Sequence, residues 1–291
     1  IQDQHTNIIL IEKNGEVIFE KEHDECADCD PYDIFKQVSA REIFEFSCEV
    51  ELDKIRFIGQ AAALNRALSN EGLRENYGLH IGRTLRKQVG SGLMSDDLLS
   101  KIMIETTAAS DARMGGATLP AMSNSGSGNQ GIAATMPVVV VADYLNVSEE
   151  KRLRALFLSH LMAIYIHSKL PKLSALCAVT TASMGSCAGI AYLLTGKFET
   201  VSMGICSMIG DISGIICDGA SNSCAMKVST SVASGYKSVL MAMDETHVTG
   251  NEGIVEHDLD RTIDNLCSIA SKSMHHIDRQ VIEIMVSKPC P

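Results

Sequence analysis

Three cysteines have the residue type and spacing of a cluster-binding site. Cys217 lies where an apolar segment ends, in the sequence Cys-Asp-Gly-Ala, and Cys224 follows 7 positions later. Cys177 lies 40 positions before Cys217, in the sequence Leu-Ser-Ala-Leu-Cys. Thiolates are soft ligands that suit iron, and a thiol at the start of a helix loses its proton readily. Three buried, inert cysteines would explain the pattern equally well, because the spacing matches no standard zinc or ferredoxin motif.

A polar, glycine-rich loop is the second stretch that could do chemistry. Residues 123–131 read Ser-Asn-Ser-Gly-Ser-Gly-Asn-Gln-Gly, and the apolar run at residues 132–142 follows at once. Glycines let a backbone approach a ligand closely, and a helix that begins here would offer free N–H groups to an anion. We predict that the loop binds a small anionic or zwitterionic ligand. The catalytic side chains expected to contact that ligand are those of Asn124, Ser125, Ser127 and Asn129.

The same loop has two other interpretations. Residues 126–131 match the G-x-G-x-x-G dinucleotide fingerprint, which requires a preceding strand and an acidic residue about 20 positions later. Pro120 and several glycines interrupt the segment before the loop, and Asp143 comes too early to be that acid. A plain surface loop is the other interpretation, and the sequence leaves it open.

Further candidates for substrate contacts lie elsewhere in the chain. Arg113 precedes a pair of glycines and could hold a carboxylate through two hydrogen bonds, or it could pair with Asp111 on the surface. Asn251 and Glu252 belong to the polar sequence Thr-Gly-Asn-Glu-Gly, and His5 lies beside a predicted strand. The sequence does not identify the general base, because the histidines on predicted helices are expected to be structural. These helical histidines are His160, His167, His275 and His276.

Cysteine usage indicates a reducing compartment. The chain has 10 cysteines and no signal-peptide pattern, so we expect most of them to be small buried side chains of a cytoplasmic protein. Cys26 and Cys29 form a lone CxxC pair. Their acidic neighbours disfavour thiolate, and we expect this pair to have no function.

Composition limits the partners and the architecture. The net charge of −11 argues against nucleic acid and against anionic membrane surfaces, which both attract basic proteins. The apolar run at residues 132–142 is too short to span a membrane. Hydrophobic residues make up 45% of the chain but aromatic residues only 4%, which favours helices packed through small side chains. Because the sequence begins with Ile1 rather than Met, we expect it to be part of a longer protein.

The elements that position these residues are mainly helical. Two β-rich runs flank Asn14-Gly15, the strongest short signal for a β-hairpin, and helical patterns follow from residue 34. We therefore predict a mainly α-helical bundle with a small N-terminal α+β piece. Residues 1–52 would be the remnant of a larger α+β domain whose sheet the hairpin completes, and residues 53–291 the helical catalytic and cluster domain. The predicted helices cover residues 34–38, 40–48, 53–68, 80–90, 96–111, 132–146, 148–169, 173–194, 198–216 as two short helices, 221–244, 259–271 and 274–287.

Taken together, the motifs resemble the iron–sulfur L-serine dehydratase alpha chain family, and in particular its L-cysteine desulfidase branch. The polar loop, the Leu-Ser-Ala-Leu-Cys sequence and the Cys-Asp-Gly-Ala sequence occur in this order and at these intervals. The resemblance covers nearly the whole chain, and the three motifs together are specific although each alone is not.

This resemblance implies a [4Fe–4S] cluster held by three cysteines, with one open iron that binds substrate. Carried over by motif, Cys177 and Cys217 are ligands. The third is either Cys224, at a shorter spacing than in the dehydratases, or an N-terminal cysteine in a Gly-Cys-Thr-Glu-Pro motif that this sequence lacks. We expect the chain as given to be free of the cluster in air.

The implied reaction is the conversion of L-cysteine to pyruvate, ammonia and sulfide, without pyridoxal phosphate. An L-serine dehydratase, with the same cluster and an oxygen leaving group, is the alternative enzyme. A non-catalytic iron–sulfur or redox sensor and a helical ligand-binding module with inert cysteines are the alternatives outside catalysis. The expected partner is a small amino acid, and a homodimer is left open.

Overall fold

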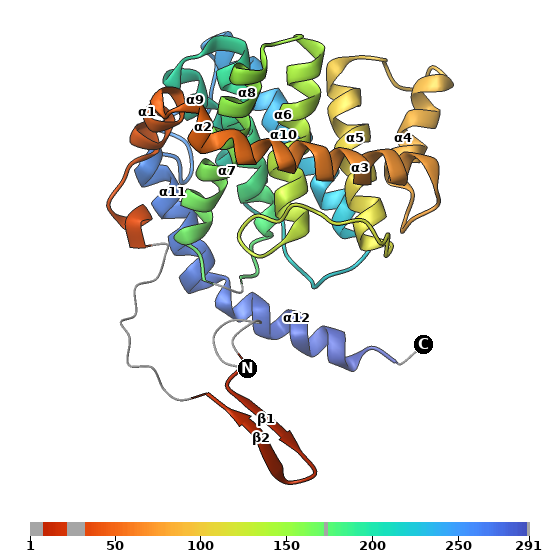
Figure 1. Cartoon of the computed structure of the whole chain (residues 1–291). Helices are drawn as coiled ribbons and strands as arrows, with labels where there is room; N and C mark the ends of the chain where they lie inside the picture. The colour runs from red at the N-terminus through yellow and green to blue at the C-terminus, as the bar shows by residue number, and fades with distance from the viewer. Residues whose placement is uncertain (1–7, 22–32, 172–173, 290–291) are drawn as a thin grey trace. The chain divides into compact units, whose positions relative to one another are not determined.

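The computed structural model describes residues 8–21, 33–171 and 174–289, and His5, Cys26 and Cys29 lie outside them. Within the described residues the protein is mainly helical, with one two-stranded antiparallel sheet near the N-terminus, as the sequence predicts (Figure 1). The chain divides into two compact units, residues 1–37 and residues 38–291. The boundary at residue 52 was proposed for domains of a longer protein, and it stays a prediction.

The first unit contains the predicted hairpin. Strand β1 (Leu10–Lys13) pairs with β2 (Glu16–Glu20), and Asn14 and Gly15 connect them with positive φ angles of 56° and 84°. Two consecutive residues with positive φ angles form a tight two-residue turn, whose backbone twist matches that of the paired strands. Every residue of both strands is exposed, and the 3₁₀ helix η1 (Asp33–Lys36) follows.

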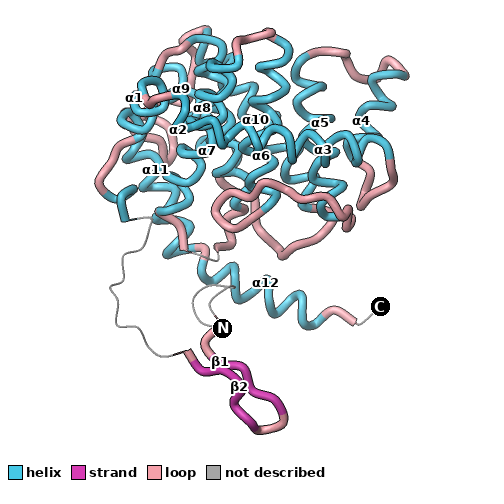
Figure 2. The backbone as a smooth tube through the Cα atoms, in the orientation of Figure 1, coloured by secondary structure: helices cyan, strands magenta, loops and turns pink. Residues whose placement is uncertain are grey.

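The second unit is a bundle of helices, with longer loops between α5 and α6 and between α10 and α11 (Figure 2). Its elements are α1 (Ala40–Glu49), α2 (Leu52–Ile55), η2 (Arg56–Ile58), α3 (Gly59–Arg74), α4 (Ile81–Gly90), α5 (Leu98–Met114), α6 (Gly128–Tyr144), α7 (Glu149–Ser168), α8 (Ala178–Thr195), α9 (Phe198–Ile212), α10 (Cys224–Met243), α11 (Leu259–Ser268), η3 (Ile269–Ser273) and α12 (His275–Ser287).

Helix α8 forms the centre of this bundle. It packs against α6, α7, α9 and α10, and small residues allow the close approach. A Cβ atom added at Gly185 would lie 2.3 Å from the Ser159 carbonyl oxygen of α7, and one at Gly189 would lie 2.7 Å from a methyl group of Val138. Of the described helices, α8 has the length and apolarity of a membrane span, and 78% of it is buried inside the protein.

Several predicted helix boundaries are wrong, each for a local reason. The helix predicted at residues 173–194 begins only at Ala178, because Leu176 forms a β-bridge with Ile216. Residues 198–212 form one continuous helix instead of two short ones, since Gly204 fits directly against Cys187. The apolar segment at residues 132–141 is buried throughout, in keeping with its almost continuous apolarity.

Candidate functional site

Cys177 and Cys217 are brought together by backbone pairing. The Cys177 N–H donates to the Ile215 carbonyl at 2.9 Å, and the Cys217 N–H donates to the Ala175 carbonyl at 2.7 Å. Cys177 is the N-cap residue of α8, and Cys224 is the first residue of α10. Both thiols therefore lie at the positive ends of long helices, which stabilise negative charge.

A tight turn places Cys224 beside the same pair. The Ser221 N–H donates to Cys224 Sγ at 3.5 Å, and Cys224 Sγ lies 3.5 Å from the Gly219 carbonyl oxygen, to which its S–H can donate. Gly219 has a φ angle of 97°, which favours glycine, and a Cβ atom there would lie 3.2 Å from Met285 Cε of α12. The turn thus fits closely beneath α12.

Lys227 supplies a positive charge to this cluster of thiols. Its Nζ donates to the Ile216 carbonyl at 2.8 Å and forms an ion pair with Asp218. The hydrogen bond from Lys227 lowers the pKa of Asp218. Burial raises the pKa of Cys177 to about 11, and Cys217 lies near enough to raise it further, whereas Lys227 acts in the opposite direction.

No three His, Cys, Asp or Glu side chains of the described residues surround a point as the ligands of a single metal ion do. A four-iron cluster has a different requirement, because each thiolate binds a separate iron atom. Three neighbouring thiols, two helix N-termini and one ammonium group match the soft donors and the negative charge of such a cluster.

The polar loop is a narrow reversal of the chain. Asn124 and Ser127 exchange backbone hydrogen bonds of 3.1 and 3.0 Å. Ser125 and Gly126 between them have φ angles of 47° and 83°, and Ser125 Oγ donates to Asn124 Oδ1 at 2.9 Å. The loop is therefore held in one conformation, with Ser125 and Ser127 partly exposed.

Asn124 anchors this turn to α7 through His160. Both side chains are buried, and Asn124 Nδ2 lies 3.2 Å from the His160 carbonyl oxygen and 3.1 Å from His160 Nδ1. Since a carbonyl oxygen only accepts, the amide nitrogen must face it, and His160 Nδ1 then accepts the second N–H. Asn124 is thus already engaged inside the protein.

The other nitrogen of His160 is also satisfied. Thr135 Oγ1 donates its proton to the Gly131 carbonyl at 2.6 Å, so it must accept from His160 Nε2 at 2.9 Å. Asn65 Nδ2 donates to the same Thr135 oxygen at 3.1 Å. The imidazole is therefore neutral with its proton on Nε2, and burial lowers its pKa to about 4.

Arg113 lies against the start of α6. A Cβ atom added at Gly128 would lie 2.2 Å from Arg113 Nε, so only glycine permits this approach. The N-cap residue Ser127 makes no side-chain hydrogen bond to the first turn, which leaves backbone N–H groups of α6 for an acceptor. The ion pairs of the described residues do not include Arg113.

The surface pairing of Arg113 with Asp111 is not what the structure shows. Asp111 is buried and accepts the Gly82 N–H at 2.8 Å, which fixes the start of α4. Burial raises the pKa of Asp111 to about 6. Arg113 instead donates from Nη1 to Met114 Sδ at 3.0 Å, and its charge has no acidic partner in an ion pair of the described residues.

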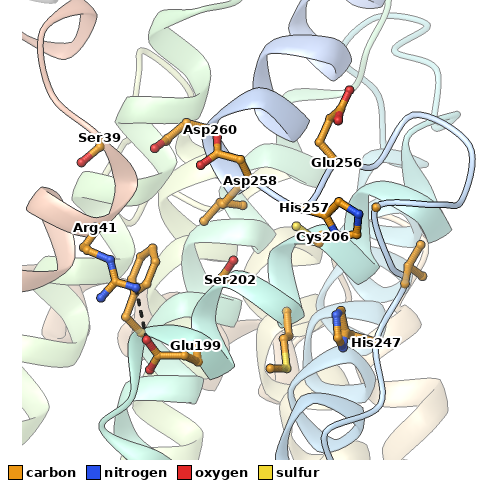
Figure 3. Close-up of a pocket in the computed structure, with 15 residues that line it drawn as sticks. Ser39, Arg41, Glu199, Ser202, Cys206, His247, Glu256, His257, Asp258 and Asp260 are labelled. Carbon is orange, nitrogen blue, oxygen red and sulfur yellow. Dashed lines mark hydrogen bonds and ion pairs between the residues drawn. The ribbon is translucent and has the colours of Figure 1, made fainter.

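The remaining predicted residues lie in different surroundings. Asn129 is buried and accepts a hydrogen bond from Ser110 Oγ at 3.1 Å. Glu252 accepts the Thr249 N–H at 2.6 Å within its own loop, next to Asn251. This loop borders a cavity of about 480 Å³ between α9 and α11, which His247 and His257 help to line (Figure 3). None of the three candidate cluster cysteines lines that cavity.

Two further contacts connect the Arg113 region to the cysteine turn. A Cβ atom at Gly115 would lie 2.5 Å from the Gly78 nitrogen, and one at Gly78 would lie 3.1 Å from Asn222 Oδ1. Asn222 belongs to the turn between Cys217 and Cys224. The loops that carry the two predicted sites therefore lie at one end of the bundle, the lower end in Figure 1.

Lys227 and Asn65 take part in these arrangements although the sequence did not single them out, whereas His160 is one of the histidines expected to be structural and is buried. Lys227 could have been found, because it lies one helical turn after Cys224 on the same face. His160 and Asn65 are 36 and 57 positions away from their partners Asn124 and Met122, and no local pattern indicates such pairs.

Comparisons with known proteins place the chain in one family, and relatives match it over nearly its whole length. Residues 16–283 match the serine dehydratase alpha chain family. A "UPF0597 protein" of Actinobacillus pleuropneumoniae serotype 3 is 73% identical over 99% of this chain and 67% of its own length. The "UPF0597 protein YhaM" of Escherichia coli (strain SMS-3-5 / SECEC) is 60% identical over 98% of this chain and 66% of its own length. The chain thus spans about two thirds of these relatives, and no solved structure matches it.

Proposed function

Because the chain belongs to the serine dehydratase alpha chain family, we propose that it forms the cluster-binding part of an iron–sulfur lyase of the L-cysteine desulfidase type. The reaction would convert L-cysteine to pyruvate, ammonia and sulfide. The observation that carries the proposal is the meeting of Cys177, Cys217 and Cys224 at two helix N-termini beside Lys227. Cytoplasmic location and the absence of nucleic-acid and membrane partners remain expectations from composition.

Cys177, Cys217 and Cys224 would hold a [4Fe–4S] cluster. Their proximity supports Cys224 as the third ligand in preference to a cysteine outside the chain. When bound, the cluster supplies a Lewis-acidic iron that favours departure of the soft sulfur atom. Burial keeps the Cys177 thiol protonated at neutral pH in the metal-free chain, so cluster binding would release protons.

The substrate carboxylate would lie beside Arg113, at the exposed edge of the first turn of α6. The guanidinium group offers paired N–H donors, and the uncapped backbone N–H groups add the partial positive charge of a helix terminus. Ser125 and Ser127 are the loop side chains still partly exposed there. Asn124 and Asn129 would keep the loop in place from inside the protein.

An L-serine dehydratase is the second candidate, since it needs the same cluster and the same carboxylate contact. The two differ in the leaving group, and the described residues that hold the carboxylate do not distinguish sulfur from oxygen. A direct comparison separates them: the equivalent full-length protein, reconstituted with iron and sulfide under anaerobic conditions, is assayed for pyruvate with L-cysteine and with L-serine.

We expect L-cysteine to give pyruvate and sulfide in equal amounts, with a higher kcat/KM than L-serine. A higher kcat/KM for L-serine would assign the chain to the dehydratases. A reconstituted protein that binds iron but turns over neither amino acid would favour the sensor, and one that binds no iron would favour a ligand-binding module.

A further inference from the structure

A depression on the surface of α4 carries positive charge without acidic partners. It has a volume of about 370 Å³ and is formed by the loop after α3 and the first turns of α4. The residues that line it are Asn76, His80, Arg83, Thr84, Arg86 and Lys87, none of them acidic. Such a surface is unexpected on a chain whose net charge is −11.

The positive charges are placed where they repel one another. Arg83, Arg86 and Lys87 are three and four positions apart, so they are neighbours on one face of α4. Like charges at this spacing destabilise a helix, and an acidic partner would usually offset them. The ion pairs of the described residues contain none of the three, whereas nearby Arg74 pairs with Glu71.

Neutral contacts hold the two guanidinium groups in place. Arg83 Nη1 donates to Asn76 Oδ1, and Arg86 Nη2 donates to the Leu73 carbonyl at 2.7 Å. Each of these bonds uses one N–H group of a guanidinium. Because both acceptors are neutral, the positive charges are not neutralised. His80 Nδ1 lies 3.0 Å from the Tyr77 carbonyl, which requires a proton on Nδ1 and leaves Nε2 for another partner.

We propose that this basic face of α4, defined by His80, Arg83, Arg86 and Lys87, binds a small, multiply charged oxyanion of the organic phosphate class. Guanidinium groups match phosphate oxygens through paired hydrogen bonds, and three cations suit a ligand with at least two negative charges. The depression is shallow and open to solvent, so the ligand that it suits is a small one held by charge at the surface.

The surroundings favour a small ligand over a long polyanion. Glu71 and Glu75 lie beside the basic face, and the charge of the whole chain is negative. Screening confines the attraction to roughly 8 Å at physiological salt. A nucleic acid or an anionic membrane would extend beyond that distance over acidic surface and be repelled. This site goes beyond the proposed lyase reaction and does not depend on it.

Isothermal titration of the chain with pyrophosphate at constant ionic strength tests the proposal. We expect one bound pyrophosphate per chain and an affinity that falls with added salt. Arg83→Gln should weaken binding about tenfold or more, because it removes a charge-assisted donor pair. Arg279→Gln is the matched control: it removes the same charge from an exposed arginine of α12 and should leave the affinity unchanged.

A triple variant, Arg83→Gln with Arg86→Gln and Lys87→Gln, should bind no pyrophosphate. Its melting temperature should stay close to that of the wild type, because the relief of like-charge repulsion offsets the lost hydrogen bonds of Arg83 and Arg86. Undiminished binding by this variant, or no binding by the wild type, would overturn the proposal. Tighter binding of citrate than of pyrophosphate would overturn the assignment to phosphates.

Discussion

At the scale of single residues, a neutral, buried histidine determines how the polar loop is held. His160 accepts from Asn124 on one side and donates to Thr135 on the other, so both ring nitrogens are satisfied only in one neutral form. Protonation of Nδ1 would point its new N–H at an N–H of the Asn124 amide group. Neither of these two N–H groups would then have an acceptor. The loop conformation therefore depends on the charge state of a residue that is buried inside the protein.

The first prediction concerns acid stability. Burial lowers the pKa of His160 to about 4 in the folded protein, from an ordinary value of 6.5. The unfolded chain therefore binds the proton more readily, and the stabilisation present above pH 6.5 is lost as the pH falls towards 4. Wild type should lose up to about 3 kcal/mol more than His160→Gln across this window. Urea unfolding at pH 7, 5.5 and 4 measures the difference.

The comparison with His160→Gln cancels the contributions of other titrating groups to the pH dependence of stability. Asp111 has a raised pKa of about 6, from an ordinary value of 3.8, and therefore acts in the opposite direction: the folded protein holds its proton more tightly than the unfolded chain, so its contribution to stability falls as the pH rises between these two values. This contribution is common to wild type and His160→Gln and cancels. Parallel pH dependences of the two proteins would contradict the neutral, buried imidazole.

The second prediction concerns the carboxylate contact. Arg113→Gln in the equivalent full-length protein should lower kcat/KM about tenfold to a hundredfold, because a charge-assisted pair of hydrogen bonds to substrate is lost. Iron content should not change, since the recorded hydrogen bond of Arg113 is to Met114 and the charges that act on Cys177 do not include Arg113. Arg261→Gln removes an exposed arginine of α11 and should have no effect. Steady-state kinetics with iron assay checks both, and wild-type kcat/KM in Arg113→Gln would exclude this residue from substrate binding.

At the scale of elements, close helix packing positions the site. Helix α8 carries Cys177 at its first end, and glycines on its α7 side bring the two helices into backbone contact. The sequence indicates this packing through small residues and predicts the buried segments correctly. It misplaces the start of α8, because the pairing of Leu176 with Ile216 joins residues 40 positions apart and has no local signal. The His160 network is hidden from the sequence for the same reason.

The third prediction tests that packing. Gly185→Ala would place a methyl group 2.3 Å from the Ser159 carbonyl oxygen, and backbone cannot move away cheaply. We expect a loss of about 1–3 kcal/mol in the free energy of unfolding. Gly90→Ala is the matched control inside α4, where nothing lies within 4 Å of the added methyl group. It should be neutral or stabilising by up to about 1 kcal/mol. Equal effects of the two changes on chemical denaturation would contradict the close contact.

At the scale of the whole molecule, the chain places three neighbouring thiols and the uncapped N-terminus of α6 at one end of the helical unit. The link runs from Arg113 through Gly115 and Gly78 to the side chain of Asn222. A Cβ atom at either glycine would crowd these contacts. The basic face of α4 begins on the loop that contains Gly78, so the proposed oxyanion site adjoins the same link. The chain covers about two thirds of its relatives, and the general base is not identified among the described residues.

The most direct test of the central claim is the iron content of the chain after anaerobic reconstitution with iron and sulfide. Wild type should bind about four irons per chain, with the spectrum of a [4Fe–4S] cluster. Cys177→Ser, Cys217→Ser and Cys224→Ser should each lose most of that iron. Cys187→Ser, which changes a buried core cysteine of α8, should keep it. A wild-type chain that remains free of iron, or full iron content in all three site variants, would contradict the assignment.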